Sequence, residues 1–247
     1  MILEAKDLRK TYRSGKNIET VALDGISFNI EKSEMVAIMG SSGSGKTTLI
    51  NAVTGLLKFD SGVVDIAGNN ILEMDHDQVA LFRRKNVGIV FQNYNLLDCL
   101  TVAENIKVPL ILDKEDEDLM DSKVEEVARI MGLEKVLDKY PYEISGGQQQ
   151  RVGICRAIVN NAKLIFADEP TGNLDSKSSK TVMEYFSKVN KEFDTSLLMV
   201  THDPVTASYC HRVIFLQDGK IVTEVIKTGE QSDFYDLIVE TQKEYIK

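Results

Sequence analysis

The chain has 247 residues, of which 43% are hydrophobic and 27% are charged, and its formal net charge is −9. This length predicts one large core, or a main domain with a smaller inserted one. A nucleic-acid-binding protein would carry a basic face, so the acidic balance argues against a nucleic-acid partner. The chain has no apolar stretch near the roughly 18 residues of a membrane span and no secretory signal, so we expect a cytoplasmic protein.

The N-terminal region predicts an antiparallel β subdomain. Two runs, Ile2–Tyr12 and Val21–Ile30, have the pattern of strands and are joined by a polar loop at Arg13–Thr20. We expect them to pair with each other, and a third strand at Val63–Ala67 to join them.

The rest of the chain alternates short apolar, β-branched runs with helical patterns, which favours an α/β fold with a mostly parallel core sheet. Apolar runs of this length are typical of strands covered on both faces. Near the end, Val213–Leu216 and Lys220–Val225 flank Asp218 and Gly219, a strong hairpin signal. The runs that predict buried core strands are Val36–Met39, Val87–Phe91, Leu164–Ala167 and Leu197–Val200.

Strand patterns are absent between residues 93 and 160, where helical spacing takes over. Thr101–Val108 is expected to form a helix that Pro109 ends, because proline cannot continue a helix without losing a hydrogen bond. Ser122–Met131 predicts a second helix, and a third is expected to start after Ser145.

We therefore expect residues 1–247 to form a single domain with a helical subdomain, about residues 93–160, inserted into it. A final helix is expected at about residues 232–245. The acidic run Asp113–Asp121 is interpreted as a solvated loop or helix start. The three cysteines are far apart and not in metal-ligand spacing, so we expect free thiols at Cys99, Cys155 and Cys210.

One segment matches the phosphate-binding pattern G-x-x-x-x-G-K-[ST] in full. It follows a predicted strand, Glu34–Met39, and opens a predicted helix, Thr48–Leu57, so a mere glycine-rich surface loop is improbable. Its backbone N–H groups and the helix N-terminus suit phosphate oxygens, with Lys46 reaching the β- and γ-phosphates and the Thr47 hydroxyl binding Mg²⁺. The residues expected to bind the nucleotide, ATP, are Gly40, Ser41, Ser42, Gly43, Ser44, Gly45, Lys46, Thr47 and Thr48.

Two adjacent carboxylates, Asp168 and Glu169, end the predicted strand at Leu164–Ala167. Adjacent acids repel each other unless a cation or a proton partner is present. Asp168 is placed to hold Mg²⁺, through water, and Glu169 is then free to act as the base that orients or deprotonates the attacking water. The pattern alone is weak, because many strands end in acidic residues.

Gln92 and His202 each follow the end of a predicted parallel strand, as Gly40 and Asp168 do. Ligands of open α/β sheets bind at this edge, so we expect the four to converge there. Gln92 is expected to contact Mg²⁺ and the attacking water, and His202 the γ-phosphate. We assign both to catalysis, together with Glu169.

A second glycine-containing helix start lies at Ser145–Gln149. Two glycines before a helix can simply form a turn, with Ser145 as the cap. Because the phosphate-binding loop already covers one side of the nucleotide, we interpret this element as a contact for ATP held by another copy of the chain. The residues expected there are Ser145, Gly146, Gly147 and Gln148.

These motifs together resemble an ATP-binding-cassette (ABC) ATPase subunit over nearly the whole chain. The resemblance implies a homodimer that sandwiches two ATP molecules, each held between one copy's loop and the other copy's signature segment, Ile144–Gln148. It implies that Tyr12 stacks on adenine, that Gly172–Asp175 crosses the interface with Asp175 at the nucleotide, and that Thr201–Asp203 contains the switch histidine. The inserted helices resemble a subdomain that docks on a membrane permease, with Gln92–Leu97 as the lever.

Two departures from the commonest ABC pattern occur: Ile144 in place of leucine, and Gly-Asn-Leu-Asp at 172–175 in place of Ser-Ala-Leu-Asp. The string at 169–175 is similar to macrolide exporters, lipoprotein-releasing ATPases and a cell-division ATPase. The strings at 92–98 and 201–210, and the final helix, are similar to bacitracin-type antimicrobial-peptide resistance transporters of Gram-positive bacteria. This resemblance implies a subunit that is peripheral on the inner face of the cell membrane.

Three classes of function remain. The leading one is a transport or mechanotransmission ATPase that drives a separate permease, in resistance or, alternatively, in lipoprotein release, macrolide export or cell division. A soluble ATPase acting on DNA or ribosomes would show long insertions, a zinc site or two cassettes, which this chain lacks. A nucleotide-dependent scaffold or sensor is barely separated from transport by sequence. The best guesses for permease contacts are Tyr94, Leu96 and Leu97.

Overall fold

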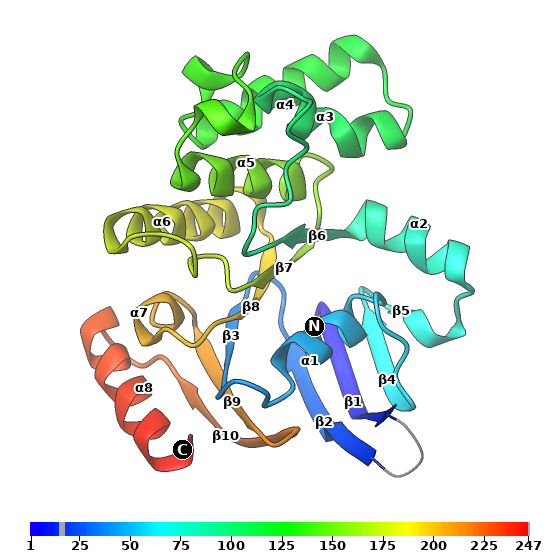
Figure 1. Ribbon diagram of the computed structural model, residues 1–247, viewed down its shortest axis with the longest axis vertical. Helices are drawn as coiled ribbons and strands as arrows, with labels where there is room; N and C mark the ends of the chain where they lie inside the picture. The colour runs from blue at the N-terminus through cyan, green and yellow to red at the C-terminus, as the bar shows by residue number, and fades with distance from the viewer. Residues whose placement is uncertain (15–17, 247) are drawn as a thin grey trace.

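The computed structural model describes residues 1–14 and 18–246. Two sheets share the lower part of the molecule in Figure 1, and a layer of helices lies above them. The first sheet has the strand order β2-β1-β4-β5, and the second has the order β10-β9-β3-β8-β7-β6. No helix of the described residues is long and apolar enough to cross a membrane.

The six-stranded sheet is parallel except for its edge strand β10. β3 pairs in parallel with both β8 and β9, and β7 pairs in parallel with both β8 and β6, which confirms the expected core sheet. Every residue of β3 and β8 is buried, because helices or the second sheet cover both faces. The strands are β3 (Met35–Met39), β6 (Val87–Val90), β7 (Leu164–Asp168), β8 (Ser196–Val200), β9 (Arg212–Gln217) and β10 (Lys220–Ile226).

The hairpin between β9 and β10 turns at Asp218 and Gly219, as expected. Both residues have positive φ angles, 47° and 75°, which a two-residue turn with the twist of the flanking strands requires.

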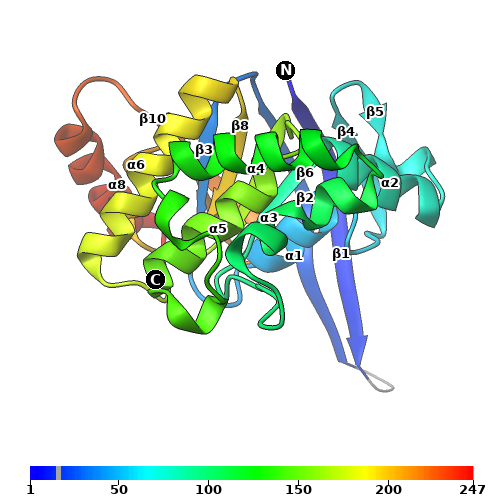
Figure 2. The same ribbon diagram turned by 90° about the horizontal axis from the view of Figure 1, so that it is seen from above.

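The four-stranded sheet is antiparallel and contains the three strands expected from the sequence. Its long β1–β2 hairpin projects from the body of the molecule (Figure 2). The polar loop expected at Arg13–Thr20 is shorter than its prediction, because the strands run to Ser14 and restart at Ile18; residues 15–17 lie outside the described part. The strands are β1 (Leu3–Ser14), β2 (Ile18–Ile30), β4 (Ser61–Ile66) and β5 (Asn69–Asn70).

Three helices, α3, α4 and α5, lie between β6 and β7 in the chain and stack above the sheet (Figure 1). The prediction that Pro109 ends the first of them is wrong, since α3 continues through it to Leu112. Leu110, which is fully buried, anchors the last turn in the core, and the N–H of Asp113 donates to the carbonyl of Pro109 at 3.1 Å. Packing therefore outweighs the missing proline N–H. The helices are α3 (Val102–Leu112), α4 (Glu117–Ile130) and α5 (Gly146–Ile158).

The second inserted helix starts five residues before the expected Ser122. Asp116 caps it, accepting from the N–H of Asp118 at 3.1 Å, and Glu117 and Asp118 occupy its first turn. Acidic side chains stabilise that end of a helix dipole, so the acidic run is a helix start. The other helices are α1 (Lys46–Val53), α2 (His76–Asn86), α6 (Ser176–Phe193), α7 (Pro204–Ala207) and α8 (Gln231–Tyr245).

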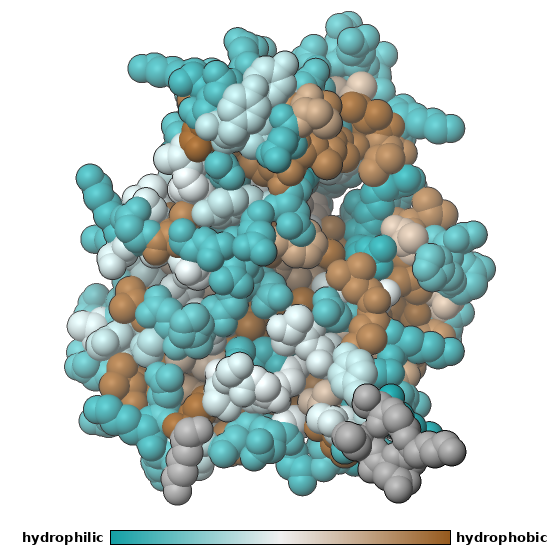
Figure 3. Space-filling model, viewed as in Figure 1, coloured by the Kyte–Doolittle hydropathy of each residue, from teal (hydrophilic) through white to brown (hydrophobic). Residues whose placement is uncertain are grey.

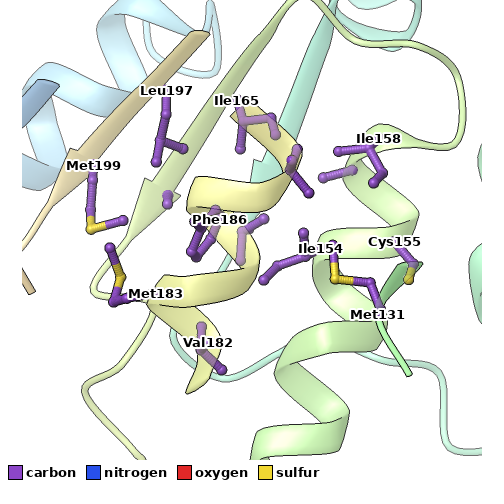
Figure 4. Close-up of a cluster of buried hydrophobic side chains, with 14 of the residues drawn as sticks. Met131, Ile154, Cys155, Ile158, Ile165, Val182, Met183, Phe186, Leu197 and Met199 are labelled. Atoms are coloured by element: carbon purple, nitrogen blue, oxygen red, sulfur yellow. The ribbon is translucent and has the colours of Figure 1, made fainter. Parts of the chain in front are cut away.

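Helix α6 packs its apolar face between the sheet and α5. Figure 4 shows Phe186 in the middle of this contact, with Ile165 and Leu197 of the sheet on one side and Ile154 and Ile158 of α5 on the other. Helix α2 differs: none of its residues, all of which are described, is fully buried. A helix without a buried stripe leaves no periodic apolar pattern, so the sequence analysis did not predict it.

Candidate nucleotide-binding and hydrolysis site

The phosphate-binding loop closes tightly between β3 and α1. Gly45 caps α1 with φ 104°, and a Cβ there would collide with the carbonyl oxygen of Ala22, so glycine is required. Nζ of Lys46 donates to the carbonyl oxygens of Gly40 at 2.9 Å and Ser41 at 2.7 Å. Oγ of Ser44 is buried and has no hydrogen-bond partner among the described residues. The loop thus presents a cationic head and helix N–H groups, which fit a phosphate chain. Ser44, which was also expected to bind the nucleotide, does not line the cavity described below.

The two carboxylates lie opposite this loop at the end of β7. Burial, and then the charge of Glu169, raise the pKa of Asp168, whereas Lys46 lowers it. Burial lowers the pKa of Lys46 against the charges of Glu169 and Asp168. These three side chains therefore form one electrostatic cluster, in which Lys46 favours the charged form of Asp168 and the neighbouring Glu169 disfavours it.

Glu169 contacts His202 directly. Nδ1 of His202 lies 2.9 Å from Oε2 and 3.0 Å from Oε1 of Glu169, so the two strand ends of β7 and β8 are joined. Glu169 has a left-handed φ of 46°, and its N–H donates to the carbonyl of Val200 at 2.9 Å. A non-glycine residue in this conformation costs energy, so the surrounding contacts must hold it there. The imidazole is thus placed to hold or release the proposed base.

A cavity of about 790 Å³ opens over the carboxyl ends of the core strands and contains the predicted site. It brings Tyr12, Gln92 and His202, three residues far apart in the sequence, to one space. Tyr12 is 43% exposed, and Nζ of Lys10 lies 5.6 Å from its ring centroid. The expected residues that line the cavity are Tyr12, Gly40, Ser41, Ser42, Gly43, Gly45, Lys46, Thr47, Thr48, Gln92, Asp168, Glu169 and His202.

Two residues of the C-terminal end also line the cavity, although no sequence motif indicates them. Gln242 of α8 and Ile246 reach the same space as Val200 and His202. Their position depends on how α8 packs on β9, β10 and α7, and no local pattern encodes this. Thr20, Val21 and Ala22 of β2 also border the cavity.

The second group of predicted nucleotide contacts does not line this cavity. Ser145 caps α5, where its Oγ accepts from the N–H of Gln148 at 3.3 Å and its own N–H donates to Oε1 of Gln148 at 2.9 Å. Asp175 caps α6 through the N–H groups of Lys177 and Ser178, both at 3.0 Å. Within one chain, Ser145, Gly146, Gly147, Gln148 and Asp175 are therefore separate from the residues that surround the cavity.

The chemistry of the donors suits a nucleotide-bound magnesium ion better than a metal held by protein alone. Across the described residues, no group of three or more histidine, cysteine, aspartate or glutamate side chains could hold a metal. The cavity instead combines two carboxylates, Asp168 and Glu169, with the oxygens of Thr47 and Gln92. Mg²⁺ commonly binds to proteins through one or two carboxylates together with substrate phosphates and water.

Residues 23–172 match a protein-family model described as ABC transporter. The chain belongs to this family. It is 47% identical over 97% of its length to the ABC transporter ATP-binding protein YxdL of Bacillus subtilis, of which it covers 92%. It is 46% identical over 98% of its length to the bacitracin export ATP-binding protein BceA of Halalkalibacterium halodurans, of which it covers 95%.

A solved structure of similar fold is the ATP-binding cassette MJ0796, described as a dimer in a post-hydrolysis state bound to ADP and Pi. This ABC chain is 36% identical to it, with a TM-score of 0.84, and covers all of that chain with 93% of its own. The ABC ATPase fold is therefore confirmed, with a parallel core, an antiparallel sheet and inserted helices. The chain is an ATP-binding subunit of an ABC transporter and an ATPase.

Proposed function

We propose that this ATPase drives a separate integral-membrane permease, as a peripheral subunit on the cytoplasmic face of the membrane, in resistance to bacitracin-type antimicrobial peptides. The observation that carries the proposal is near full-length similarity, at 46% identity, to a protein named for bacitracin export. The strings at 92–98 and 201–210 support the same group.

We infer that the residues around the cavity divide the work of hydrolysis. Lys46 and the loop N–H groups bind the phosphates, and Tyr12 stacks on the adenine. Thr47, Gln92 and Asp168 hold Mg²⁺, which would neutralise charge on the phosphates. Glu169 takes the proton of the attacking water, with His202 close enough to position its carboxylate.

The second group of residues completes the site from another copy of the chain. Ser145, Gly146, Gly147 and Gln148 form a capped helix N-terminus that does not contact the cavity of its own chain. Such an end binds anions, so it suits the γ-phosphate held by a partner, with Asp175 beside it. We infer a homodimer that closes on two ATP molecules and opens after hydrolysis.

The permease contact is proposed for the inserted helices. A cleft of about 650 Å³ lies between α2, α3 and α5. Exposed Leu81 and Leu112 border it, with Arg83, Arg84 and Arg156 among its charges. Figure 3 shows apolar side chains over α3 and α2, on either side of a hollow. Of the residues expected at this contact, Leu97 is exposed, whereas Tyr94 and Leu96 are half-buried.

The first test is the substitution Glu169→Gln in the purified protein. We expect steady-state ATP hydrolysis to fall by about 10²-fold or more, since the amide cannot accept the proton, while ATP binding is retained. The control is Lys46→Ala, which should reduce binding itself. Turnover of Glu169→Gln near the wild-type rate would show that the base is wrongly assigned.

A second candidate function is macrolide export, lipoprotein release or a cell-division role by mechanotransmission. The favouring observation is 43% identity, over 90% of this chain, to the macrolide export ATP-binding/permease protein MacB of Shigella flexneri; the matched part is 34% of that protein. Capture of the native permease separates the two. A permease with about ten spans and a large extracellular domain supports peptide resistance, and a four-span partner supports the second candidate.

A further inference from the structure

The loop after β6 and the loop after β7 are tied together by one side chain. We call residues 92–95 the Gln92 loop and residues 172–175 the Asn173 loop. Nδ2 of Asn173 donates to the main-chain oxygen of Gln92 at 3.1 Å and to Oδ1 of Asn93 at 2.8 Å. Nε2 of Gln92 donates in return to Oδ1 of Asn173 at 3.5 Å. A primary amide has two N–H donors, and both serve the Gln92 loop.

The carboxamide of Gln92 rests against the main chain of the Asn173 loop. A Cβ placed on Gly172 would lie 2.7 Å from Nε2 and 3.3 Å from Cδ of Gln92. A side chain at position 172 would therefore have to displace the Gln92 carboxamide. Both Gly172 and Asn173, where the commonest family pattern has serine and alanine, thus contribute to this contact. The 3.5 Å bond is the weakest of the three, so the Gln92 side chain can leave while the main-chain tie remains.

The Asn173 loop also contacts the start of α5. Cδ2 of Leu174 would lie 3.4 Å from a Cβ on Gly146, and the hydroxyl of Tyr94 would lie 2.8 Å from that Cβ. Arg156 of α5 donates to the carbonyls of Tyr94 at 2.8 Å and Asn95 at 2.6 Å. The two loops and the N-terminus of α5 therefore form one packed unit.

We propose that Asn173 is a positioning residue for ATP hydrolysis. Its amide clamps the Gln92 loop to the Asn173 loop, and so sets the place from which the Gln92 carboxamide reaches the nucleotide cavity. Tyr94 and Asn95 have φ angles of 59° and 49°. This left-handed conformation is costly for tyrosine, so external ties help to hold the loop in place. The inference rests on the proposed role of Gln92 in hydrolysis.

The first experiment measures the clamp without activity. In Asn173→Ala, we expect the amides of Tyr94 and Asn95, which bond to Phe91 and Asn93, to exchange with deuterium about tenfold faster than in the wild type. The matched control is Asn69→Ala, which removes two side-chain bonds, to Ile66 and Ala67, away from the site. Unchanged exchange in Asn173→Ala overturns the clamp, whatever Gln92 does.

The second experiment measures kcat and KM for MgATP. We expect Asn173→Ala to lower kcat about tenfold, since a misplacement of about 1 Å can cost up to 100-fold, with KM changed less than about twofold. When Asn173→Ala is added to Gln92→Ala, we expect almost no further loss of kcat, because both substitutions act through the Gln92 carboxamide. If Asn173→Ala lowers kcat equally in the wild type and in Gln92→Ala, or leaves kcat unchanged, the positioning role is overturned.

Two further results keep these outcomes separate. Asn173→Asp keeps the side-chain shape but sets an acceptor against the oxygens of Gln92 and Asn93, so we expect the same loss of kcat at an unchanged Tm. A loss only in the alanine variant, with a lowered Tm, contradicts the proposal. Wild-type kcat in Gln92→Ala alone refutes the role of Gln92, and the positioning role of Asn173 fails with it, even if the exchange experiment supports the clamp.

Discussion

At the scale of the residue, the site is built from groups that would be unfavourable elsewhere. Asp168 carries a carboxylate whose pKa is raised by burial and by Glu169 beside it. Glu169 stands in a left-handed backbone conformation, and Ser44 has a buried hydroxyl with no partner in the described part of the chain. Such features persist because the rest of the fold over-determines them, and we expect the Asp168 carboxylate to gain a favourable partner when a phosphate chain and a cation enter.

The substitution Asp168→Asn tests this conflict between stability and function. Because the folded-state pKa is raised, the native protein binds the proton more tightly than the unfolded chain does, so ionised Asp168 opposes folding at neutral pH. We expect the neutral isostere to raise the Tm of the nucleotide-free protein by a few degrees and to abolish Mg²⁺-dependent hydrolysis.

The raised pKa of Asp168 also fixes the direction in which the effect of Asp168→Asn on the Tm changes with pH. The energetic penalty of the ionised carboxylate is present in full above its raised folded-state pKa and is lost as the pH falls towards the ordinary pKa of an aspartate. The Tm difference between Asp168→Asn and wild type should therefore narrow on acidification. The exposed Asp98→Asn serves as the control. A Tm lowered by Asp168→Asn at pH 7 would contradict the argument.

At the scale of the element, helix α3 is the clearest case of tertiary packing acting against local preference. Pro109 lies in its eighth position, where a proline lacks the N–H that should meet the carbonyl of Asn105. Asn105 itself is buried, and its Nδ2 bonds to the carbonyls of Leu97, Leu100 and Thr101. This side chain ties the preceding loop to the helix, and the core side chains hold its final turn.

Replacing Pro109 by alanine should therefore stabilise the protein. We expect a gain of about 1 kcal/mol, or a Tm higher by about 2–4 °C, because the missing hydrogen bond can form while the packing is retained. Thermal unfolding of the two proteins measures it. Pro141→Ala is the matched control with the opposite sign, since Pro141 starts a 3-10 helix, where its fixed φ is favourable. A lowered Tm for Pro109→Ala would mean that the rigid ring stabilises the last turn.

At the scale of the whole molecule, the two groups of proposed nucleotide contacts do not share one cavity. The cavity holds the phosphate-binding loop and the two carboxylates, and the capped start of α5 lies outside it. Two clusters of buried hydrophobic side chains pack the core, and each takes residues from β3, β7, β8 and β9 of the central sheet. We infer that a second copy supplies the half of the site that the cavity lacks.

We expect dimerisation to depend on nucleotide. Glu169→Gln with MgATP should elute from gel filtration as a dimer, because trapped ATP joins two partial sites, whereas the nucleotide-free protein should elute as a monomer. Adding Lys46→Ala to Glu169→Gln should abolish the dimer. A stable dimer without nucleotide would contradict the expectation.

Sequence patterns predicted the elements whose signal is local. The buried strands, the Asp218–Gly219 hairpin and the start of α5 are found where apolar runs, turn residues and a capping serine indicate them. Helix α2 was missed because it buries no stripe, and the end of α3 was placed too early because a proline rule cannot take account of a buried Leu110. A sequence-based prediction is therefore correct where the local conformational preference of the residues agrees with their tertiary packing, and it fails where packing overrides that preference.

The sequence by itself determined the kind of chemistry: the glycine spacing, the lysine and the strand-ending carboxylates at 168 and 169 require only local geometry. The sequence also placed His202 and Asp168 at one sheet edge, but the tertiary structure alone decided which side chains touch there. It placed His202 on Glu169, the end of α8 at the cavity over that edge, and Asn173 on the Gln92 loop. These contacts join residues that lie 33 to about 200 positions apart in the sequence. No local pattern indicates that such residues are neighbours, because they meet only when the strands take their order in the sheet.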